Sequence, residues 1–395
     1  MNKNIEHIVY LGGFGFPVGL AEIQKIKLVS KSLIAAGARV LVICRYGVHK
    51  RKKGIDIQKS GSYGQIRYVH TSGTPFRPES FLKRNFLKMY GVIGEIALLM
   101  KLSFKKQLDV AIISSKRFDS ILLYFLLSKL LGFKTVLNFA EFNSALSREK
   151  GKKTGFNDYL FERYAFGLVD GVIPISEFLE NMVKEKSPRK PCIKIPALCD
   201  FSKFNPDQKK PVKPYFLFCG LLNRELIEFI LEAFDRIDED TPYYLYLVVN
   251  GSKEGLALLQ QEIAHRKKAD LIKTFKELPY RELVDLYLNA KGLLIPLRPV
   301  PRDIARFPHK IGEYSASSNP IITTNVGEIV HFFEDDKNAY VAASYDVKAY
   351  SKKMEMVVKD PEKAKLIGQN GWKLGNEHFN YLRYGDKLID FFKKL

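Results

Sequence analysis

The chain has 395 residues, of which 46% are hydrophobic, with 28 Phe and 20 Tyr. This is more than one hydrophobic core usually contains, so the composition favours two domains. The formal net charge of +20 fits nucleic acid, an anionic membrane or an anionic substrate as partner, and its distribution narrows the choice. Residues 1–200 hold 33 Lys and Arg against 16 Asp and Glu, whereas residues 201–395 hold 30 against 27.

Several classes of site are excluded at this stage. The four cysteines show no CxxC spacing and are interpreted as reduced core residues: Cys44, Cys192, Cys199 and Cys219. The seven histidines lack HxxxH or HExxH spacing, so no metal site is predicted. The start, MNKNIEHIVYLGG, has no apolar signal-peptide core, and the longest apolar stretches are too short to span a bilayer. A cytoplasmic protein is therefore expected.

Short β-branched runs alternate with helical patterns along the first half of the chain. The predicted strands are 6–11, 38–44, 65–70, 109–114, 134–139, 170–176 and 192–197. The same order restarts in the second half, with predicted strands at 215–220, 243–251, 272–278, 292–297, 320–324 and 339–343. Nearly all-apolar strands separated by helices indicate parallel sheets covered on both faces.

The predicted fold class is therefore α/β, with two doubly wound Rossmann-like domains facing each other across a cleft. Residues 1–205 form the first domain and residues 215–375 the second. The proline- and charge-rich segment 206–214, PDQKKPVKP, is predicted to be the linker. Residues 376–395 are amphipathic, and we expect this last helix to pack back on the first domain.

Glycines dominate the first strand-to-helix turn, LGGFGFPVGLAEIQ. Gly12, Gly13 and Gly15 would let backbone amides approach an anion without an intervening side chain. The spacing departs from GxGxxG, however, because Gly19 arrives one residue late. Arg45 rather than an acid ends the second strand, which would favour NADP over NAD. The turn is thus predicted either to bind a ligand or to be a glycine-rich turn without one.

Two further segments of the second half place cations at helix starts. In FCGLLNRELIEF, Arg224 lies at the N-terminus of a predicted helix, where a cation opposes the helix dipole. An anion bound beside Arg224 would explain this position; the alternative is a solvated side chain. In RFPHKIGEYSASSNPIITTNVGE, residues 306–328, Lys310 and Glu313 share one helix face. They form either a solvated ion pair or part of a diphosphate site at the sheet edge.

The segment FPHKIGEYSASSNPIITTNVGEI resembles the donor-site motif of family 4 glycosyltransferases with the two-Rossmann GT-B fold. DGVIPISEFLEN and KIPALCDFSKFNP resemble the end of that family's acceptor domain, and YFLFCGLLNRELIEFILEAF its entry into the donor domain. The resemblance covers most of the chain and is strongest from 168 to 345. It implies that the chain transfers a sugar from a nucleotide-diphosphate sugar.

The resemblance also implies roles for individual residues. Lys310 matches the lysine that contacts the donor diphosphate, and Arg224 lies where the family has a basic partner. Glu313 matches the glutamate that accepts hydrogen bonds from the ribose. Glu313 is the second glutamate of a pair in the family, and Ala305 stands where the first would be, so the backbone around Arg306, Phe307 and Pro308 is expected to contact the sugar instead.

In the first domain, the resemblance implies that Gly12, Gly13 and Gly15 approach the donor phosphates. Glu141 matches an acidic position on the acceptor side. Family members retain the anomeric configuration, and two fixed cations can stabilise the leaving diphosphate without a metal. The expected donor is a UDP- or GDP-sugar, bound as a substrate with no other cofactor, and the acceptor is a glycan or lipid-linked molecule of cell-surface polysaccharide or glycolipid synthesis.

Basic clusters with interleaved apolar residues at 49–54 and 76–106 suit an anionic membrane surface. A peripheral location at the inner face of the cytoplasmic membrane is predicted, the alternative being a solvated helix face. Two other functions are weighed: an NADP-linked oxidoreductase, which leaves 306–328 unexplained, and a non-enzymic nucleic-acid-binding protein, which makes no use of a second sheet. No nucleic-acid partner is expected.

Overall fold

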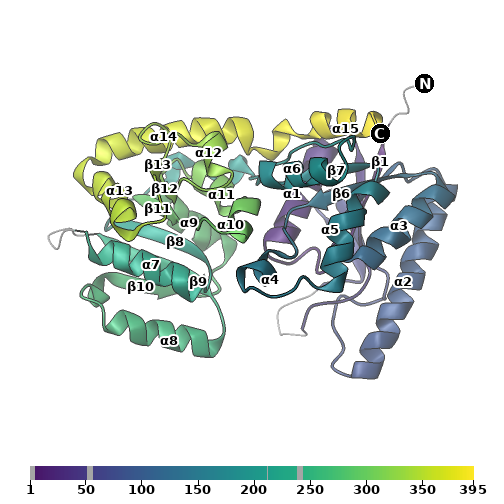
Figure 1. Cartoon of the computed structure of the whole chain (residues 1–395), viewed down its shortest axis with the longest axis horizontal. Helices are drawn as coiled ribbons and strands as arrows, with labels where there is room; N and C mark the ends of the chain where they lie inside the picture. Colours follow the sequence, from purple (N-terminus) through teal and green to yellow (C-terminus); the bar gives the residue numbers. More distant parts are fainter. Residues whose placement is uncertain (1–4, 51–56, 211, 238–242) are drawn as a thin grey trace. The chain divides into compact units, whose positions relative to one another are not determined.

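The structure is a computed structural model that describes residues 5–50, 57–210, 212–237 and 243–395. The chain divides into two compact units (Figure 1). Unit 1 comprises Met1–Leu198 and Tyr381–Leu395, and unit 2 comprises Cys199–Asn380. The cluster predicted at 49–54 lies largely outside the described residues.

A seven-stranded sheet with the order β3-β4-β2-β1-β5-β6-β7 forms the centre of unit 1. Its strands are β1 (His7–Leu11), β2 (Arg39–Cys44), β3 (Ser60–Tyr63), β4 (Ile66–His70), β5 (Val110–Ile113), β6 (Lys134–Phe139) and β7 (Gly171–Pro174). All neighbours are parallel except the β3–β4 hairpin. The central strands are buried on both faces, which is why they read as continuous apolar runs.

Helices follow most strands of unit 1, as parallel crossovers require. They are α1 (Ala21–Ala35), α2 (Phe81–Phe104), α3 (Phe118–Leu131), α4 (Ala145–Glu149), α5 (Phe156–Leu168), α6 (Glu177–Lys186) and α15 (Gly385–Lys393). The predicted strand 192–197 is wrong: this segment runs beside β7 with a single bridge at Cys192.

The last residues of the chain complete unit 1. Ser32 Oγ on α1 donates to the carbonyl of Tyr381, at 2.6 Å, and α15 packs against α1. At Gly385, a Cβ would lie 2.3 Å from the Ser32 carbonyl oxygen, so only glycine allows this approach. The core beneath these helices includes Leu388 and Phe392 of α15.

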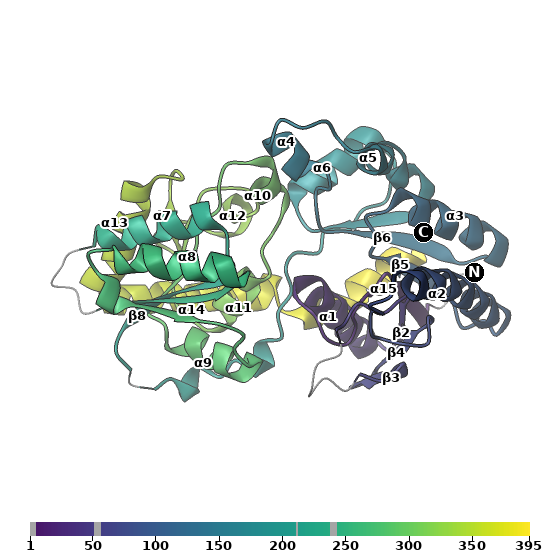
Figure 2. The ribbon, with the colours of Figure 1, turned by 90° about the horizontal axis from the view of Figure 1, so that it is seen from below.

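Unit 2 is built on a six-stranded, fully parallel sheet with the order β10-β9-β8-β11-β12-β13. Its strands are β8 (Tyr215–Leu221), β9 (Tyr244–Asn250), β10 (Ile272–Phe275), β11 (Gly292–Ile295), β12 (Ile321–Thr324) and β13 (Tyr340–Ala342). Its helices are α7 (Arg224–Asp235), α8 (Lys253–Ala264), α9 (Tyr280–Asn289), α10 (Pro301–Ala305), α11 (Lys310–Ala316), α12 (Ile329–Phe332), α13 (Val347–Lys359) and α14 (Pro361–His378). Figure 2 shows α7 and α8 on one face of the sheet and α9 on the other.

The chain passes from unit 1 to unit 2 at Leu198 and Cys199, ahead of the predicted linker 206–214. Described residues of that segment bind unit 2. Lys209 Nζ donates to Asn319 Oδ1 at 2.7 Å, and the Lys210 amide donates to Asn289 Oδ1 at 2.6 Å. The described residues of 206–214 thus belong to unit 2.

Candidate functional site

The strand order of unit 2 reverses between β8 and β11. The chain leaves β8 toward β9 on one side, and the strands after β11 continue on the other. Ligands of doubly wound sheets bind outside the carboxyl ends of the strands at such a switch point. Arg224 follows β8 at this point, and Arg298 follows β11. The chain then passes through the short helix α10 before it enters α11.

Lys310 and Glu313 are brought together at the start of α11. Lys310 Nζ lies 3.0 Å from Glu313 Oε2, and the two side chains remain 29% and 14% exposed. The ammonium also lies 5.6 Å from the centre of the Tyr287 ring. Burial has the largest single effect and lowers the pKa of Lys310, but Glu313 and Cys219 together outweigh it, so the net pKa is raised. Lys310 is therefore a fixed, fully charged cation at neutral pH.

An ion-pair network around the buried Asp303 supports the loop between β11 and α11. Arg298 Nε lies 3.0 Å from Asp303 Oδ2, and Arg298 Nη1 lies 2.7 Å from Glu225 Oε2. Arg306 Nη2 reaches the same aspartate at 2.9 Å. Burial has the largest single effect and lowers the pKa of the Arg298 guanidinium, but the interactions with Asp303 and Glu225 together outweigh it and raise the pKa. The network ties the start of α7 to α10.

Arg298 is a residue that sequence reasoning missed. It follows the buried strand GLLI by three positions and is 8% exposed. An arginine so soon after a buried strand was a usable signal, because a buried charge needs partners. Its partners, however, are not adjacent to it in the sequence.

The other residues predicted in unit 2 take different positions. Arg224 is the exposed first residue of α7, next to the cap Asn223, whose Oδ1 accepts from the Leu226 amide at 3.2 Å. Phe307 is 2% exposed and stacks on Phe332 with ring centres 5.5 Å apart, so its side chain belongs to the core. Pro308 directly precedes the last residue before α11.

Ala305, the position of the missing glutamate, is 1% exposed at the end of α10. Gly327, which precedes Glu328 in the GE pair, explains part of the burial of Ala305. Gly327 has φ of +59°, and a Cβ there would lie 2.9 Å from the Ile304 carbonyl oxygen. The close approach of Gly327 to α10 leaves the end of this short helix enclosed.

In unit 1 the predicted glycine loop is largely bonded to itself. Gly12 has φ of +82°, and a Cβ there would lie 2.2 Å from the Ser114 carbonyl oxygen. The Phe14 amide donates to the Gly12 carbonyl at 2.8 Å, and the Phe16 amide to the Gly13 carbonyl at 2.9 Å. Gly12 therefore serves a left-handed turn packed against β5, independently of any ligand.

Side chains from neighbouring elements hold the carbonyls of the same loop. Cys44 Sγ donates to the Gly13 carbonyl at 2.7 Å, and His49 Nε2 lies 2.7 Å from the Gly15 carbonyl. His70 Nε2 contacts the Phe16 carbonyl at 3.1 Å, and burial lowers the pKa of His70 to about 4. These contacts give three backbone carbonyls of the loop a side-chain partner.

Arg45 is part of a buried cluster in unit 1. Its Nε lies 2.6 Å from Glu95 Oε2, and its Nη2 donates to the Tyr124 hydroxyl at 2.8 Å. Glu95 is fully buried on α2. Because its guanidinium is bound internally, Arg45 gives no support to a site for the 2′-phosphate of NADP.

Glu141 is exposed on the loop after β6 and forms an ion pair with Lys116, which follows β5. Both side chains lie at the carboxyl edge of the unit 1 sheet, at the loops after β5 and β6. This placement agrees with the edge on which a ligand of unit 1 would bind.

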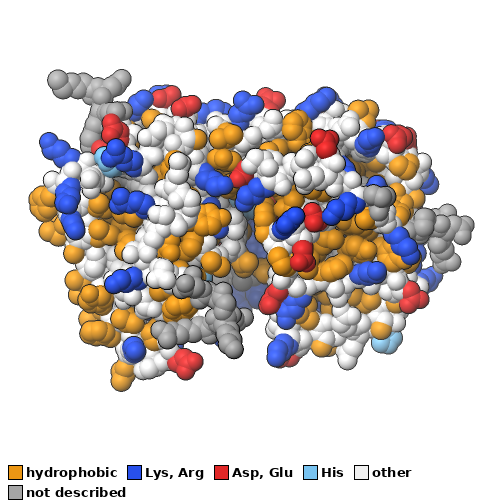
Figure 3. Space-filling model, turned by 180° about the vertical axis from the view of Figure 1, so that it is seen from behind, with side chains coloured by type: hydrophobic (Ala, Val, Ile, Leu, Met, Phe, Trp, Pro, Cys, Tyr) orange, Lys and Arg blue, Asp and Glu red, His pale blue; other side chains and the backbone are white. Residues whose placement is uncertain are grey.

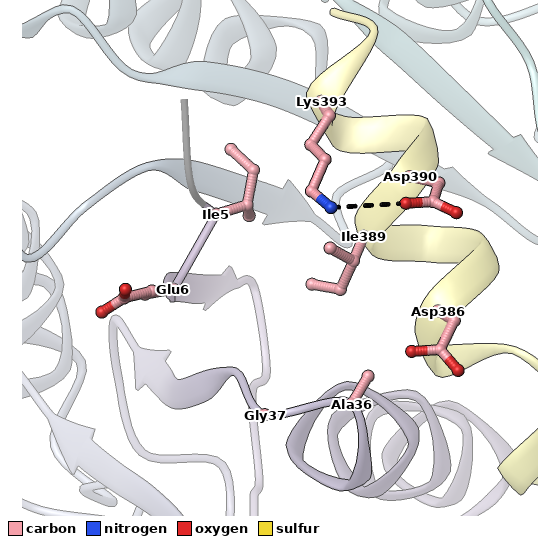
Figure 4. A pocket seen from close by; sticks show the side chains of 8 residues that line it. All are labelled: Ile5, Glu6, Ala36, Gly37, Asp386, Ile389, Asp390 and Lys393. Atoms are coloured by element: carbon pink, nitrogen blue, oxygen red, sulfur yellow. Dashed lines mark hydrogen bonds and ion pairs between the residues drawn. The ribbon is translucent and has the colours of Figure 1, made fainter. Parts of the chain in front are cut away.

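The described residues also line hollows at the opposite, amino-terminal edge of the unit 1 sheet. The one in Figure 4 has a volume of about 330 Å³ and is lined by Ile5, Glu6, Ala36, Gly37, Asp386, Ile389, Asp390 and Lys393. Three carboxylates against one lysine make it unsuited to a diphosphate. Among the described residues, no group of three His, Cys, Asp or Glu side chains could hold a metal ion.

Comparison with known proteins links unit 2 to a family. Residues 201–374 match the sequence model of the family "Glycosyl transferases group 1". This segment contains Arg224, Arg298, Lys310 and Glu313. No curated protein matches the chain in a sequence search.

Solved structures show the fold of the whole chain. Sucrose-phosphate synthase of Thermosynechococcus elongatus superposes with a TM-score of 0.77 at 15% identity, covering 98% of each chain. A glycosyltransferase of Rickettsia africae gives 0.72 at 15% identity, covering 99% of each. HepE of Anabaena, solved in complex with UDP and glucose, gives 0.68 at 13% identity, covering 99% and 100%. The two-domain GT-B fold class is thereby confirmed.

Proposed function

We propose that the protein is a retaining, metal-independent glycosyltransferase that uses a UDP- or GDP-sugar as donor and a glycan or lipid-linked acceptor. The observation that carries the proposal is the Lys310–Glu313 pair, 3.0 Å apart at the β8/β11 switch point, inside the segment that matches the glycosyltransferase family. HepE, with the same fold, binds UDP-glucose. A role in cell-surface polysaccharide or glycolipid synthesis is part of this proposal.

In the proposed reaction, the bond between the anomeric carbon and the β-phosphate oxygen breaks, and a bond from that carbon to an acceptor oxygen forms on the same face. The acceptor hydroxyl gives its proton to the departing phosphate. Lys310 and Arg224 stabilise the negative charge that develops on this phosphate. A unit charge pair at 4 Å is worth roughly 4 kcal/mol at an effective dielectric of 20.

Glu313 is assigned to the ribose hydroxyls, whose protons it would accept in hydrogen bonds. The ribose hydroxyls and the diphosphate of the donor would then have to compete with the ion pair that Lys310 and Glu313 form with each other. Since ammonium and carboxylate are only partly exposed, this pair pre-orients both groups before the donor arrives.

A thermal-shift panel of UDP, GDP, ADP and NADP tests the proposal, because a ligand that binds only the folded state stabilises it by mass action. We expect UDP or GDP to raise the melting temperature, and Lys310→Ala to abolish the rise. Stabilisation by NADP alone would favour an oxidoreductase instead. No shift with any of the four would contradict the proposed donor class.

We further propose that unit 1 associates with an anionic membrane through α2. Only Gly91, Glu95, Leu99 and Leu102 of this 24-residue helix are buried, a single stripe at helical spacing. Six of its apolar side chains are between 62% and 79% exposed: Phe81, Leu82, Phe86, Met89, Ile93 and Phe104. In Figure 3, hydrophobic and basic side chains gather along the edge of unit 1 where α2 runs. Among the described residues, no helix has the length and hydropathy of a membrane span.

Cations flank this apolar face. Lys83, Arg84 and Lys88 occupy its first two turns, and Lys101, Lys105 and Lys106 lie at its other end. Each cation near an anionic bilayer contributes about 1 kcal/mol, and the apolar side chains add burial that salt does not screen.

Cosedimentation with anionic and neutral vesicles tests the membrane proposal. Changing Lys83, Arg84 and Lys88 to Glu should release the protein from anionic vesicles and leave nucleotide binding unchanged. The matched control changes Lys348, Lys352 and Lys359 of α13 to Glu, which alters the net charge equally. Equal binding to both vesicle types, or an equal loss in the control, would contradict a role for α2.

A further inference from the structure

A second hollow lies at the amino-terminal edge of the unit 1 sheet, beside the end of α2. It has a volume of about 280 Å³ and is lined by residues near the starts of β1, β2 and β4 and by the last turn of α2. Val9, Leu41 and Leu102 are the apolar part of this lining on which the argument rests. Val9 lies opposite Leu41 in the β1–β2 register, so the two side chains share one face of the sheet. Small-ligand sites span about 300 to 1,000 Å³, so this hollow accommodates part of a ligand rather than all of a large one.

Two arginines line the same hollow. Arg39 is the first residue of β2, Arg67 is the second residue of β4, and both are exposed. Arg67 lies opposite Leu41 in the β2–β4 register, and Arg39 precedes Leu41 by two positions, so both arginines project from the face that carries Leu41. Among the described residues, no carboxylate forms an ion pair with either guanidinium. Unpaired like charges on neighbouring strands repel each other, and an anion bound between them would remove this cost.

Further cations surround the hollow. Lys105 and Lys106 follow Leu102 in the turn that ends α2, and their amides donate to α2 carbonyls at 3.2 and 2.9 Å, which fixes this turn. The carboxylates of the same edge are engaged elsewhere. Asp109 Oδ2 accepts from two backbone amides at the start of β1, at 3.1 and 2.9 Å, and Glu6 lines the hollow of Figure 4. The second hollow therefore combines an apolar floor with a positive rim.

This combination fits a ligand that joins an anionic group to an apolar chain. A guanidinium can bind a phosphate through two parallel hydrogen bonds, which a lysine ammonium cannot. A free phosphate would leave the apolar floor in water, and a neutral apolar molecule would leave the arginines without an anion. The apolar face of α2 continues to the hollow, because Phe104, two residues after Leu102, is 78% exposed. The membrane surface proposed for α2 is therefore an adjacent source of such a ligand.

We infer that this hollow binds an anionic membrane phospholipid, with the phosphate at Arg39 and Arg67 and the start of the acyl chains against Val9, Leu41 and Leu102. The inference rests on the membrane association proposed for α2 and adds the class of lipid to it. The cations along α2 attract any anionic surface, whereas two arginines in a hollow select a headgroup by its shape and charge. Because the hollow lies at the sheet edge opposite the loops after β5 and β6, the bound lipid is an anchor rather than a substrate.

Calorimetric titration of the full chain with short-chain lipids below their micelle concentration tests the inference without a bilayer. The probes are dihexanoyl phosphatidylglycerol, dihexanoyl phosphatidylcholine and inorganic phosphate. Phosphatidylglycerol should bind about tenfold or more tightly than phosphatidylcholine, whose own ammonium meets the same cations, and than phosphate, which has no apolar chain. Equal binding of the two lipids, or phosphate binding as tight as that of phosphatidylglycerol, would overturn the inference.

A pair of substitutions at the rim tests which residues bind the headgroup. Arg39→Gln combined with Arg67→Gln should weaken phosphatidylglycerol binding by about tenfold or more, as expected for the loss of charged hydrogen-bond donors. Arg163→Gln combined with Arg189→Gln is the matched control, because both arginines are exposed in unit 1, do not line the hollow, and change the net charge equally. The control should bind as wild type does. An equal loss in both pairs, or a loss in neither, would contradict the assignment.

Vesicle binding, measured separately, distinguishes failure of this inference from failure of the membrane proposal. Changing Lys83, Arg84 and Lys88 of α2 to Glu should release the protein from anionic vesicles and leave binding of the short-chain phosphatidylglycerol unchanged. A wild-type protein that binds this lipid but no vesicle would support the hollow and contradict the role of α2. Vesicle binding without binding of the short-chain lipid would overturn the hollow and leave the role of α2 intact.

Discussion

Two lysines, one in each unit, show how differently the fold can hold the same side chain. Lys25 in unit 1 is 1% exposed and has no hydrogen-bond partner among the described residues. Burial lowers its pKa to about 7, with Glu22 only partly opposing this. Lys310 in unit 2 lies 3.0 Å from Glu313, and its pKa is raised. Both belong to helices at the carboxyl edge of a parallel sheet.

The difference is decided by the carboxylate. A lysine in direct contact with a carboxylate keeps its charge despite partial burial, whereas a fully buried lysine without a hydrogen-bonded carboxylate is half-neutral near pH 7. A permanent cation suits a diphosphate, and a neutral amine suits a hydroxyl. The comparison therefore separates a permanently charged lysine in unit 2 from a lysine in unit 1 that loses its charge near neutral pH.

The largest effect is expected on removing the charge of Lys310 in unit 2. Lys310→Ala should lower the rate of sugar transfer by about 10² to 10³, as for loss of one group that stabilises developing charge. The melting temperature should change little, since the ion pair with Glu313 is partly exposed and such pairs contribute only about 0 to 1 kcal/mol. Turnover and thermal unfolding are measured together, with Lys348→Ala on α13 as control. Near-normal turnover in a folded Lys310→Ala protein would remove this lysine from the site.

The second prediction concerns Lys25 and pH. Its pKa is lower in the folded than in the unfolded chain, so the unfolded state binds more protons between about pH 7 and pH 10. This lysine should therefore make the free energy of unfolding rise with pH by up to about 1.4 kcal/mol per pH unit in that window. Below pH 7 the penalty is constant.

Urea unfolding at pH 7, 8 and 9 measures the slope, and Lys25→Met isolates it from other titrating groups. The variant should be more stable than wild type at pH 7, and the difference should shrink by about 2 to 3 kcal/mol toward pH 9. Parallel pH curves for the two proteins would show that Lys25 keeps its charge in the fold, and the contrast with Lys310 would fail.

The third prediction concerns the glycine loop of unit 1. Gly12→Ala should lower the free energy of unfolding by more than the roughly 1 to 3 kcal/mol of a left-handed residue, because its Cβ would also lie 2.2 Å from the Ser114 carbonyl oxygen. Gly132→Ala is the matched control, with φ of +74° and open space around the position. Equal losses in urea unfolding would mean that packing against Ser114 is not what requires glycine.

The smallest effect is expected at Glu313. Glu313→Gln keeps the size of the side chain, so we expect about tenfold weaker nucleotide binding and little change in the catalytic constant, because ribose contacts are the same in ground and transition states. Titration calorimetry with the nucleotide found in the panel gives the affinity. Unaltered affinity with a slower catalytic step would instead assign Glu313 to the chemistry.

The glycine turns also show where sequence reasoning reached its limit. LGGFGFP and FCGLLN look alike as strand, glycine and helix. Only the structure shows that the Phe14 and Phe16 amides of the first turn donate to carbonyls of the same turn. Cys44, His49 and His70 also contact carbonyls of this turn. A glycine-rich turn therefore does not by itself predict a ligand loop.

The sequence by itself determined the two mainly parallel sheets and the pairing of Lys310 with Glu313. Both are short-range properties, since apolar runs of strand length require burial on two faces, and helical residues three positions apart share a face. The tertiary structure alone decided that Arg45 meets Glu95 and that Arg298 bridges Asp303 and Glu225. It also decided that Lys25 Nζ has no hydrogen-bond partner in the part of the chain that the structure describes. Arg45 and Glu95, like Arg298 and Glu225, are 50 or more positions apart in the sequence. Arg298 and Asp303 are close in the sequence. The register of strands and helices sets them, because a buried charge takes whichever partner the packing brings within reach.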